Sequence, residues 1–101
     1  MIRNVVLGRL RPSADSTSDS AVLDQALESL AALPFDGLLA VHVGRDLGLR
    51  EGGWSFAITS DWRDEDAYRV YDLDGEHNRL RREYFAVVCD QIARVQFAIH
   101  A

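Results

Sequence analysis

Several segments of the chain place apolar side chains on both faces of an extended strand, and this pattern restricts the fold more than any other feature. Val5 and Val6 are adjacent, as are Leu38 and Leu39. Successive side chains of a strand point to opposite faces of a sheet, so a sheet made of such strands is apolar on both faces. Trp54 to Trp62 adds a third strand of this kind. Both faces of the predicted sheet therefore need cover.

Strand and helix patterns follow one another in the order β-α-β-β-α-β. We predict strands at 2–10, 38–43, 54–62 and 94–100 and helices at 21–33, 64–73 and 76–93. This order is typical of the ferredoxin-like fold, an α+β fold with a four-stranded antiparallel sheet and helices on one face. Because the helices can cover only one face, we expect a second copy to cover the other, which gives a homodimeric α/β barrel.

Composition excludes several classes of protein. The 101 residues suit one domain, 1–101, and the net charge of −5 argues against nucleic acid and anionic membranes as partners. No apolar run approaches the length that spans a membrane, and we expect a cytoplasmic protein. The three histidines and scattered carboxylates lack metal-ligand spacing, so we expect no metal and no cofactor. The single cysteine, Cys89, is expected to be a buried small side chain.

Tyr71 and His77 are the residues that most suggest chemistry. They flank a break between two helical patterns at Asp74–Gly75. An imidazole near neutral pH can accept a proton, and a phenol can donate a hydrogen bond to a developing oxyanion. The alternative interpretation is structural: Tyr71 lies at the edge of the core and His77 forms a local hydrogen bond.

Three segments resemble the stress-responsive A/B barrel domain (Dabb) family. They are Val5–Leu7, Val41–Arg50 and Ser60–Trp62, and the resemblance extends over nearly the whole chain. It implies a dimeric α+β barrel. The family commonly has a Tyr followed by His-Pro-x-His at the helix break, where Tyr71 and His77 match the Tyr and the last His. Asp74–Gly75 stands in place of His-Pro, and Asn4 stands where the first strand commonly has His.

The resemblance also implies a function. A plant branch of the family cyclises linear polyketide chains with a pair similar to Tyr71 and His77. We therefore predict a possible polyketide-type cyclase with a pocket between sheet and helices for a small apolar or polyketide-like ligand. The expected lining residues are Asn4, Val6, Gly8, Leu23, Ala26, Ile58, Leu80 and Tyr84. Two alternatives stay open: a non-catalytic, stress-related dimeric binding protein, and a cofactor-free monooxygenase like those of related dimeric barrels.

Overall fold

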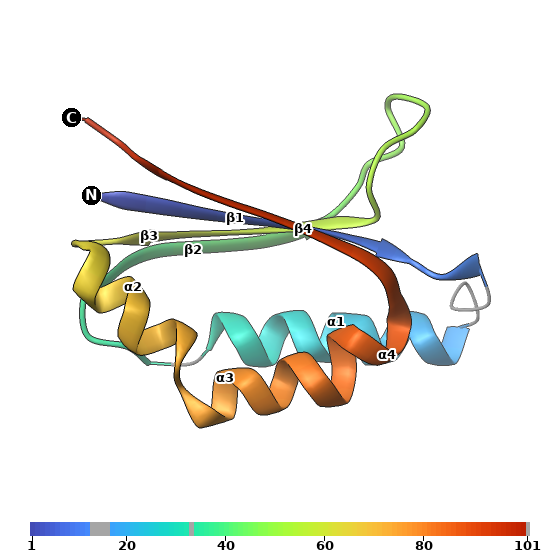
Figure 1. Cartoon of the computed structure of the whole chain (residues 1–101). Coiled ribbons are helices and arrows are strands. Elements are labelled where there is room, and N and C mark those ends of the chain that lie inside the picture. The colour runs from blue at the N-terminus through green and yellow to red at the C-terminus, as the bar shows by residue number, and fades with distance from the viewer. Residues whose placement is uncertain (13–16, 33, 101) are drawn as a thin grey trace.

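One antiparallel sheet carries all the helices on one of its faces (Figure 1). The computed structural model describes residues 1–12, 17–32 and 34–100. The strands are β1 (Ile2–Leu10), β2 (Leu38–Arg45), β3 (Phe56–Trp62) and β4 (Cys89–Ala98), in the spatial order β2-β3-β1-β4. The helices are α1 (Thr17–Ala31), α2 (Glu65–Asp72), α3 (Gly75–Leu80), a π-helical turn η2 (Arg81–Phe85) and α4 (Ala86–Val88). The predicted ferredoxin-like α+β fold is confirmed.

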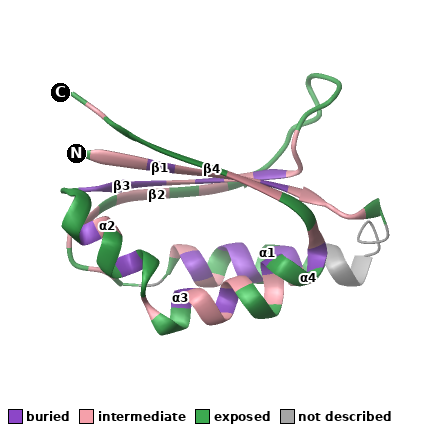
Figure 2. Ribbon diagram, in the orientation of Figure 1, coloured by how far each residue is buried: buried purple, intermediate pink, exposed green. Residues whose placement is uncertain are grey.

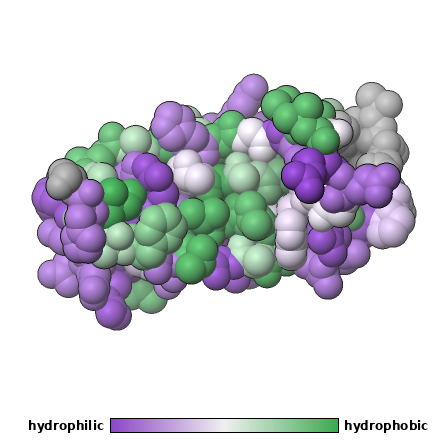
Figure 3. Space-filling model, turned by 90° about the horizontal axis from the view of Figure 1, so that it is seen from above, coloured by the Kyte–Doolittle hydropathy of each residue, from purple (hydrophilic) through white to green (hydrophobic). Residues whose placement is uncertain are grey.

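The central strand β1 divides its side chains between the two faces of the sheet. Val6 pairs with Ile58 of β3 and Arg94 of β4, and these side chains share the helical face. Val5 pairs with Val95 on the opposite face, which has no helix over it (Figure 2). Figure 3 views that open face from above and shows apolar side chains gathered at its centre with polar ones around them.

The core lies between the helical face of the sheet and the helices. Its largest cluster consists of Leu23, Ala26, Leu27, Leu30, Phe56, Ile58, Leu80, Phe85 and Val88. A second cluster contains Trp62, Ala67 and Tyr71 and is packed against Phe35 and Tyr68. Burial of these apolar side chains supplies the main favourable contribution to folding.

The last helical region ends earlier than the sequence suggests. A helix was predicted over 76–93, but helical structure ends at Val88 and β4 begins at Cys89. The residues from Ala86 to Ala93 include no Gly or Pro to mark the change. Pairing with β1 decides it, because Cys89 is opposite Leu10 and the Arg11 N–H donates to the carbonyl of Val88 at 3.0 Å.

The π-helical turn changes which side chains reach the core. A regular helix would place Tyr84 one turn after Leu80. In η2 the turn is wider, and Phe85, five residues after Leu80, is the buried aromatic side chain while Tyr84 is half-buried.

Other element boundaries differ by a few residues. Helix α1 begins at Thr17 rather than at 21, β2 extends to Arg45, and β3 begins at Phe56 rather than at Trp54. The predicted end of the first helix, Leu33, lies outside the described residues. The register between β1 and β4 shifts between Arg9 and Leu10, as at a β-bulge, one residue after Gly8.

Gly8 and Gly44 provide a matched test of the packing. A Cβ at Gly8 would overlap the Phe56 ring, whereas a Cβ at Gly44 would meet no atom within 4 Å. We predict that Gly8→Ala lowers the free energy of unfolding by about 1–3 kcal/mol, as overpacking typically does. Gly44→Ala, in β2, should change it by less than about 0.5 kcal/mol, as is usual at open surface sites. Urea denaturation of both variants measures the difference, and equal stability would contradict the described packing.

Candidate functional site

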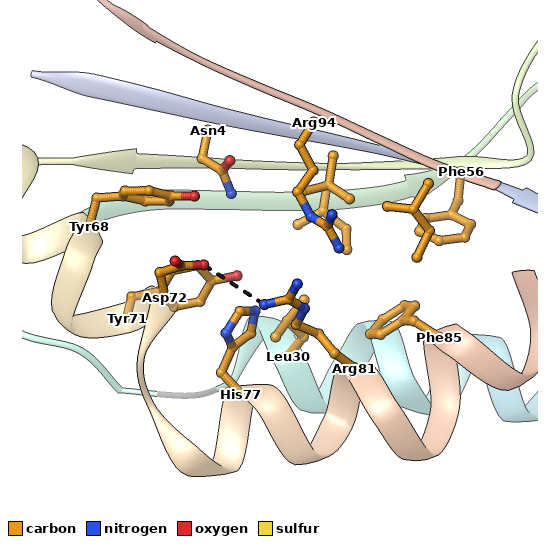
Figure 4. A pocket seen from close by; sticks show the side chains of 13 residues that line it. Asn4, Leu30, Phe56, Tyr68, Tyr71, Asp72, His77, Arg81, Phe85 and Arg94 are labelled. Atoms are coloured by element: carbon orange, nitrogen blue, oxygen red, sulfur yellow. Dashed lines mark ion pairs between the residues drawn. The ribbon is translucent and has the colours of Figure 1, made fainter.

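A cavity of about 40 Å³ lies between the helical face of the sheet and the α2–α3–η2 region (Figure 4). Its polar lining residues are Asn4, Tyr68, Tyr71, Asp72, His77, Arg81 and Arg94. Its apolar lining residues are Val6, Leu30, Phe56, Ile58, Phe85 and Ile92. The cavity is therefore an apolar recess whose polar groups are gathered near the break between α2 and α3.

The helix break brings Tyr71 and His77 into contact. Helix α2 ends with its C-cap at Leu73, and Asp74 is the N-cap of α3. The Asp74 carboxylate accepts a hydrogen bond from the His77 backbone N–H at 2.9 Å, which fixes the start of α3. The two rings then face each other with centroids 4.0 Å apart and planes inclined by 31°. The predicted break is confirmed, and it places the phenol beside the imidazole.

Neighbouring aromatic rings hold Tyr71 in place. Its ring centroid lies 4.7 Å from that of Trp62 and 5.2 Å from that of Phe35. Trp62 is itself fixed by a hydrogen bond from its Nε1 to Ser60 Oγ at 2.9 Å. Such aromatic contacts stabilise a fixed ring orientation in addition to burying area. Figure 4 shows the Tyr71 hydroxyl directed into the cavity.

Burial keeps both ring groups uncharged near neutral pH. Desolvation lowers the pKa of His77 to about 4, and the nearby charge of Arg81 adds to this effect. The carboxylates of Asp72 and Asp74 and the backbone of Tyr71 act in the opposite direction. Desolvation also raises the pKa of Tyr71 above its usual range. At pH 7 the site therefore presents a neutral imidazole, able to accept a proton, next to a protonated phenol, able to donate a hydrogen bond.

His77 also carries a polar atom without a partner. Its Nδ1 is buried and makes no hydrogen bond within the described part of the chain. Buried polar atoms of this kind are uncommon in folded proteins, because each leaves a desolvation cost uncompensated. One nitrogen of the imidazole is thus left without a structural partner among the described residues.

Asn4 supplies a polar group from the sheet. Its side chain is 2% exposed, and its Oδ1 accepts a hydrogen bond from Gln96 Nε2 at 2.9 Å. Its amide nitrogen points down toward the cavity in Figure 4. Asn4 therefore offers a second hydrogen-bond donor on the side of the cavity opposite His77.

The structure brings together five of the residues named from the sequence. Asn4, Val6, Ile58, Tyr71 and His77 all line the cavity. The other five predicted residues do not line the cavity. The space beside Gly8 is filled by the Phe56 ring, and Tyr84 packs at the edge of the core. The last three are part of the core cluster: Leu23, Ala26 and Leu80.

Several lining residues were missed. Phe85 is brought in by the π-helical turn, and Arg94 comes from the part of β4 that pairs with Val6. The sequence signal available for Phe85 was its spacing of five residues from another apolar residue, Leu80. Arg81 was not predicted at the site, but it is half-buried and lines the cavity.

Other candidates lie away from the cavity. His42 is exposed on β2, on the open face of the sheet. Cys89 is half-buried, and burial raises its thiol pKa to about 11, so it is protonated at neutral pH. Among residues 1–12, 17–32 and 34–100, no three His, Cys, Asp or Glu side chains converge on a point that could hold a metal ion.

The fold and cavity define a class of protein: a ferredoxin-like α+β domain with a site between sheet and helices. The chain belongs to the stress-responsive A/B barrel domain (Dabb) family, whose model matches residues 2–99. No curated protein matches the chain. Within the described residues, no helix combines the length and apolar character needed to cross a membrane.

Three solved structures resemble the chain closely in fold. A dimeric ferredoxin-like protein of unknown function from Thermobifida fusca YX is 31% identical, with a TM-score of 0.81 over 97% of this chain and 90% of that one. A Dabb family protein from Mesorhizobium loti MAFF303099 is 18% identical, with a TM-score of 0.77 over 99% and 97%. The hydroxynitrile lyase from Passiflora edulis is 16% identical, with a TM-score of 0.74 over 98% and 93%. At these last two identities the similarity concerns the fold alone.

The low pKa of His77 predicts a specific pH dependence of stability. In the unfolded chain the imidazole binds a proton below about pH 6.5, whereas in the folded protein it does so only below about pH 4. Between these values the unfolded state binds more protons, so lowering the pH destabilises the fold. From pH 7.5 to pH 5 this costs about 2 kcal/mol at 1.36 kcal/mol per pH unit. His77→Gln should lack this component, and urea denaturation of both proteins at one protein concentration measures it. Parallel pH profiles would contradict a buried neutral His77.

Proposed function

We propose that this protein is a small-molecule-processing Dabb domain that catalyses an aldol-type cyclisation of a polyketide-like chain, with His77 as the base and Tyr71 as the hydrogen-bond donor. The observation that carries the proposal is the contact between a neutral imidazole and a protonated phenol in the wall of a partly enclosed, largely apolar cavity. Acid/base chemistry requires such a pair with opposite roles.

The proposed reaction gives each of these groups one role. A neutral nitrogen of His77 takes a proton from the carbon next to a carbonyl, and the electron pair of that C–H bond forms an enolate. The Tyr71 hydroxyl, with the Asn4 amide, donates hydrogen bonds to the enolate oxygen. The enolate carbon then forms a bond to a second, electrophilic carbonyl carbon, whose oxygen takes the proton back from His77. Loss of water gives the unsaturated ring.

The low pKa of His77 limits the substrates that this mechanism can use. A weak base removes only acidic protons at a useful rate. Protons on a carbon between two carbonyl groups are the most acidic of this type, and linear polyketide chains contain them at alternate carbons. This argument favours a β-dicarbonyl chain over a simple ketone.

We also propose that the protein is a homodimer joined through the open face of the sheet. The solved relative with 31% identity is dimeric. The face is apolar at Val5, Val95 and Phe97, of which the last two are 54% and 45% exposed in the single chain. Arg3 and Asp61 on this face neutralise each other, because Arg3 Nε and Nη2 donate hydrogen bonds to the two Asp61 carboxylate oxygens at 2.8 and 3.0 Å. Covering this face would therefore not leave Arg3 or Asp61 as an unpaired charge.

A synthetic linear polyketone with four carbonyl groups on alternate carbons tests the catalytic proposal. It is used in two forms, with a carboxylate on a short alkyl tail (the polyketone acid) and as the methyl ester (the polyketone ester). We predict cyclisation of at least one form to a phenol, followed by absorbance and NMR. His77→Gln should lower the rate by about 100-fold or more, and Tyr71→Phe by about 100-fold.

Two matched variants serve as controls for that assay. His100→Gln and Tyr84→Phe make the same chemical changes outside the cavity and should keep the wild-type rate. If neither form of the polyketone reacts faster than in buffer, the protein is not a cyclase of this type, and a non-catalytic binding role takes its place.

Matched valine substitutions test the dimer. Val95→Asp puts a carboxylate on the open face, where burial without a partner is costly, and should give a monomer at micromolar concentration in sedimentation velocity. Val70→Asp makes the same change on α2, where Val70 is 68% exposed, and should leave the dimer intact. Wild-type protein that sediments as a monomer would contradict the proposal.

A further inference from the structure

Two arginines approach the cavity from opposite sides. Arg81 extends from η2, and Arg94 extends from the helical face of β4, where it pairs with Val6 of β1 (Figure 4). Asp72 is the only acidic residue in the described lining of the cavity. Two cations against one anion leave the cavity with one excess positive charge, although the whole chain carries a net charge of −5.

Most hydrogen-bond donors of these two side chains are unused. Arg94 makes no hydrogen bond or ion pair with the residues that the structure describes, and its side chain is exposed. Arg81 Nη1 donates to Asn78 Oδ1 at 3.0 Å and lies 3.8 Å from Asp72 Oδ1, which is beyond hydrogen-bond distance. Two guanidinium groups that converge without a full counter-charge repel each other, and an anion between them removes that repulsion.

The arginines stand where the cavity meets a second, more open groove. This groove has a volume of about 320 Å³ and shares Arg81, Ile92 and Arg94 with the cavity. Its other lining residues are Asn78, Arg82 and Ala86, so the described lining holds three arginines and no acidic residue. A ligand too long for the 40 Å³ cavity can therefore extend past Arg81 and Arg94 into a cationic groove.

We propose that the pocket binds a ligand that carries a carboxylate, with this group held between Arg81 and Arg94 and the carbonyl-bearing part beside Tyr71 and His77. The assignment of the reacting part rests on the proposed function, whereas the carboxylate site rests on the arginines alone. Planar guanidinium groups donate paired hydrogen bonds to a carboxylate, and such charge-assisted bonds are strong. A monoanion also neutralises the single excess charge of the cavity.

Binding by the His77→Gln variant tests the proposal without turnover. Isothermal titration calorimetry compares the polyketone acid with the polyketone ester. The acid should bind about tenfold more tightly or better, because charge-assisted hydrogen bonds are about twice as strong as neutral ones. Adding Arg94→Gln or Arg81→Gln should remove this preference while leaving the affinity for the ester within about twofold, a change of about 0.4 kcal/mol.

Arg69→Gln is the matched control. Arg69 lies on α2 with 72% of its side chain exposed and does not line the cavity, so the preference for the acid should remain. Three results would each overturn the carboxylate site. They are equal binding of the acid and the ester, a preference for the acid that survives both arginine substitutions, and no binding of the acid. Tight, arginine-dependent binding of the acid without any cyclisation by the wild type would support this site and reject the cyclase instead. Thermal unfolding confirms that each variant is folded, and the two arginine variants provide independent tests.

Discussion

The alternation of β1 between two faces of the sheet is the constraint on which the rest of the molecule depends. β1 is hydrogen-bonded to β3 on one side and β4 on the other, so its register places Asn4 and Val6 over the helices and Val5 on the open face. The first set forms the ceiling of the cavity, and the second forms part of the apolar surface that we assign to the dimer. A shift by one residue would exchange the two sets and remove both sites. The cavity and the proposed dimer interface thus both depend on one strand register.

The second requirement is the break between α2 and α3. A continuous helix would separate Tyr71 from His77 by more than one turn. The Asp74 cap restarts the helix and brings the imidazole onto the phenol, in a setting that removes water from both rings. The same burial that lowers the basicity of His77 keeps it neutral and available at pH 7. This balance explains why the proposed chemistry is confined to acidic protons between carbonyl groups.

Much of the fold was predictable, because local patterns decide it. Short runs of adjacent apolar residues such as Val5 and Val6 predicted the strands, and Asp74–Gly75 predicted the helix break. The site was predictable only in part. Tyr71, His77 and Asn4 were found, but Arg94 reaches the cavity through a strand that begins where a helix was expected, and Phe85 reaches it through a π-helical turn. Both features depend on tertiary pairing and packing, which local periodicity does not contain.

The central claim is that a ligand binds against the Tyr71–His77 wall of the cavity. NMR of the three histidine rings tests it most directly, because His42 and His100 are exposed and lie outside the cavity. Saturation with the polyketone acid should shift the ring signals of His77 and leave those of His42 and His100 unchanged. Binding of the acid with an unchanged His77 signal would contradict the account.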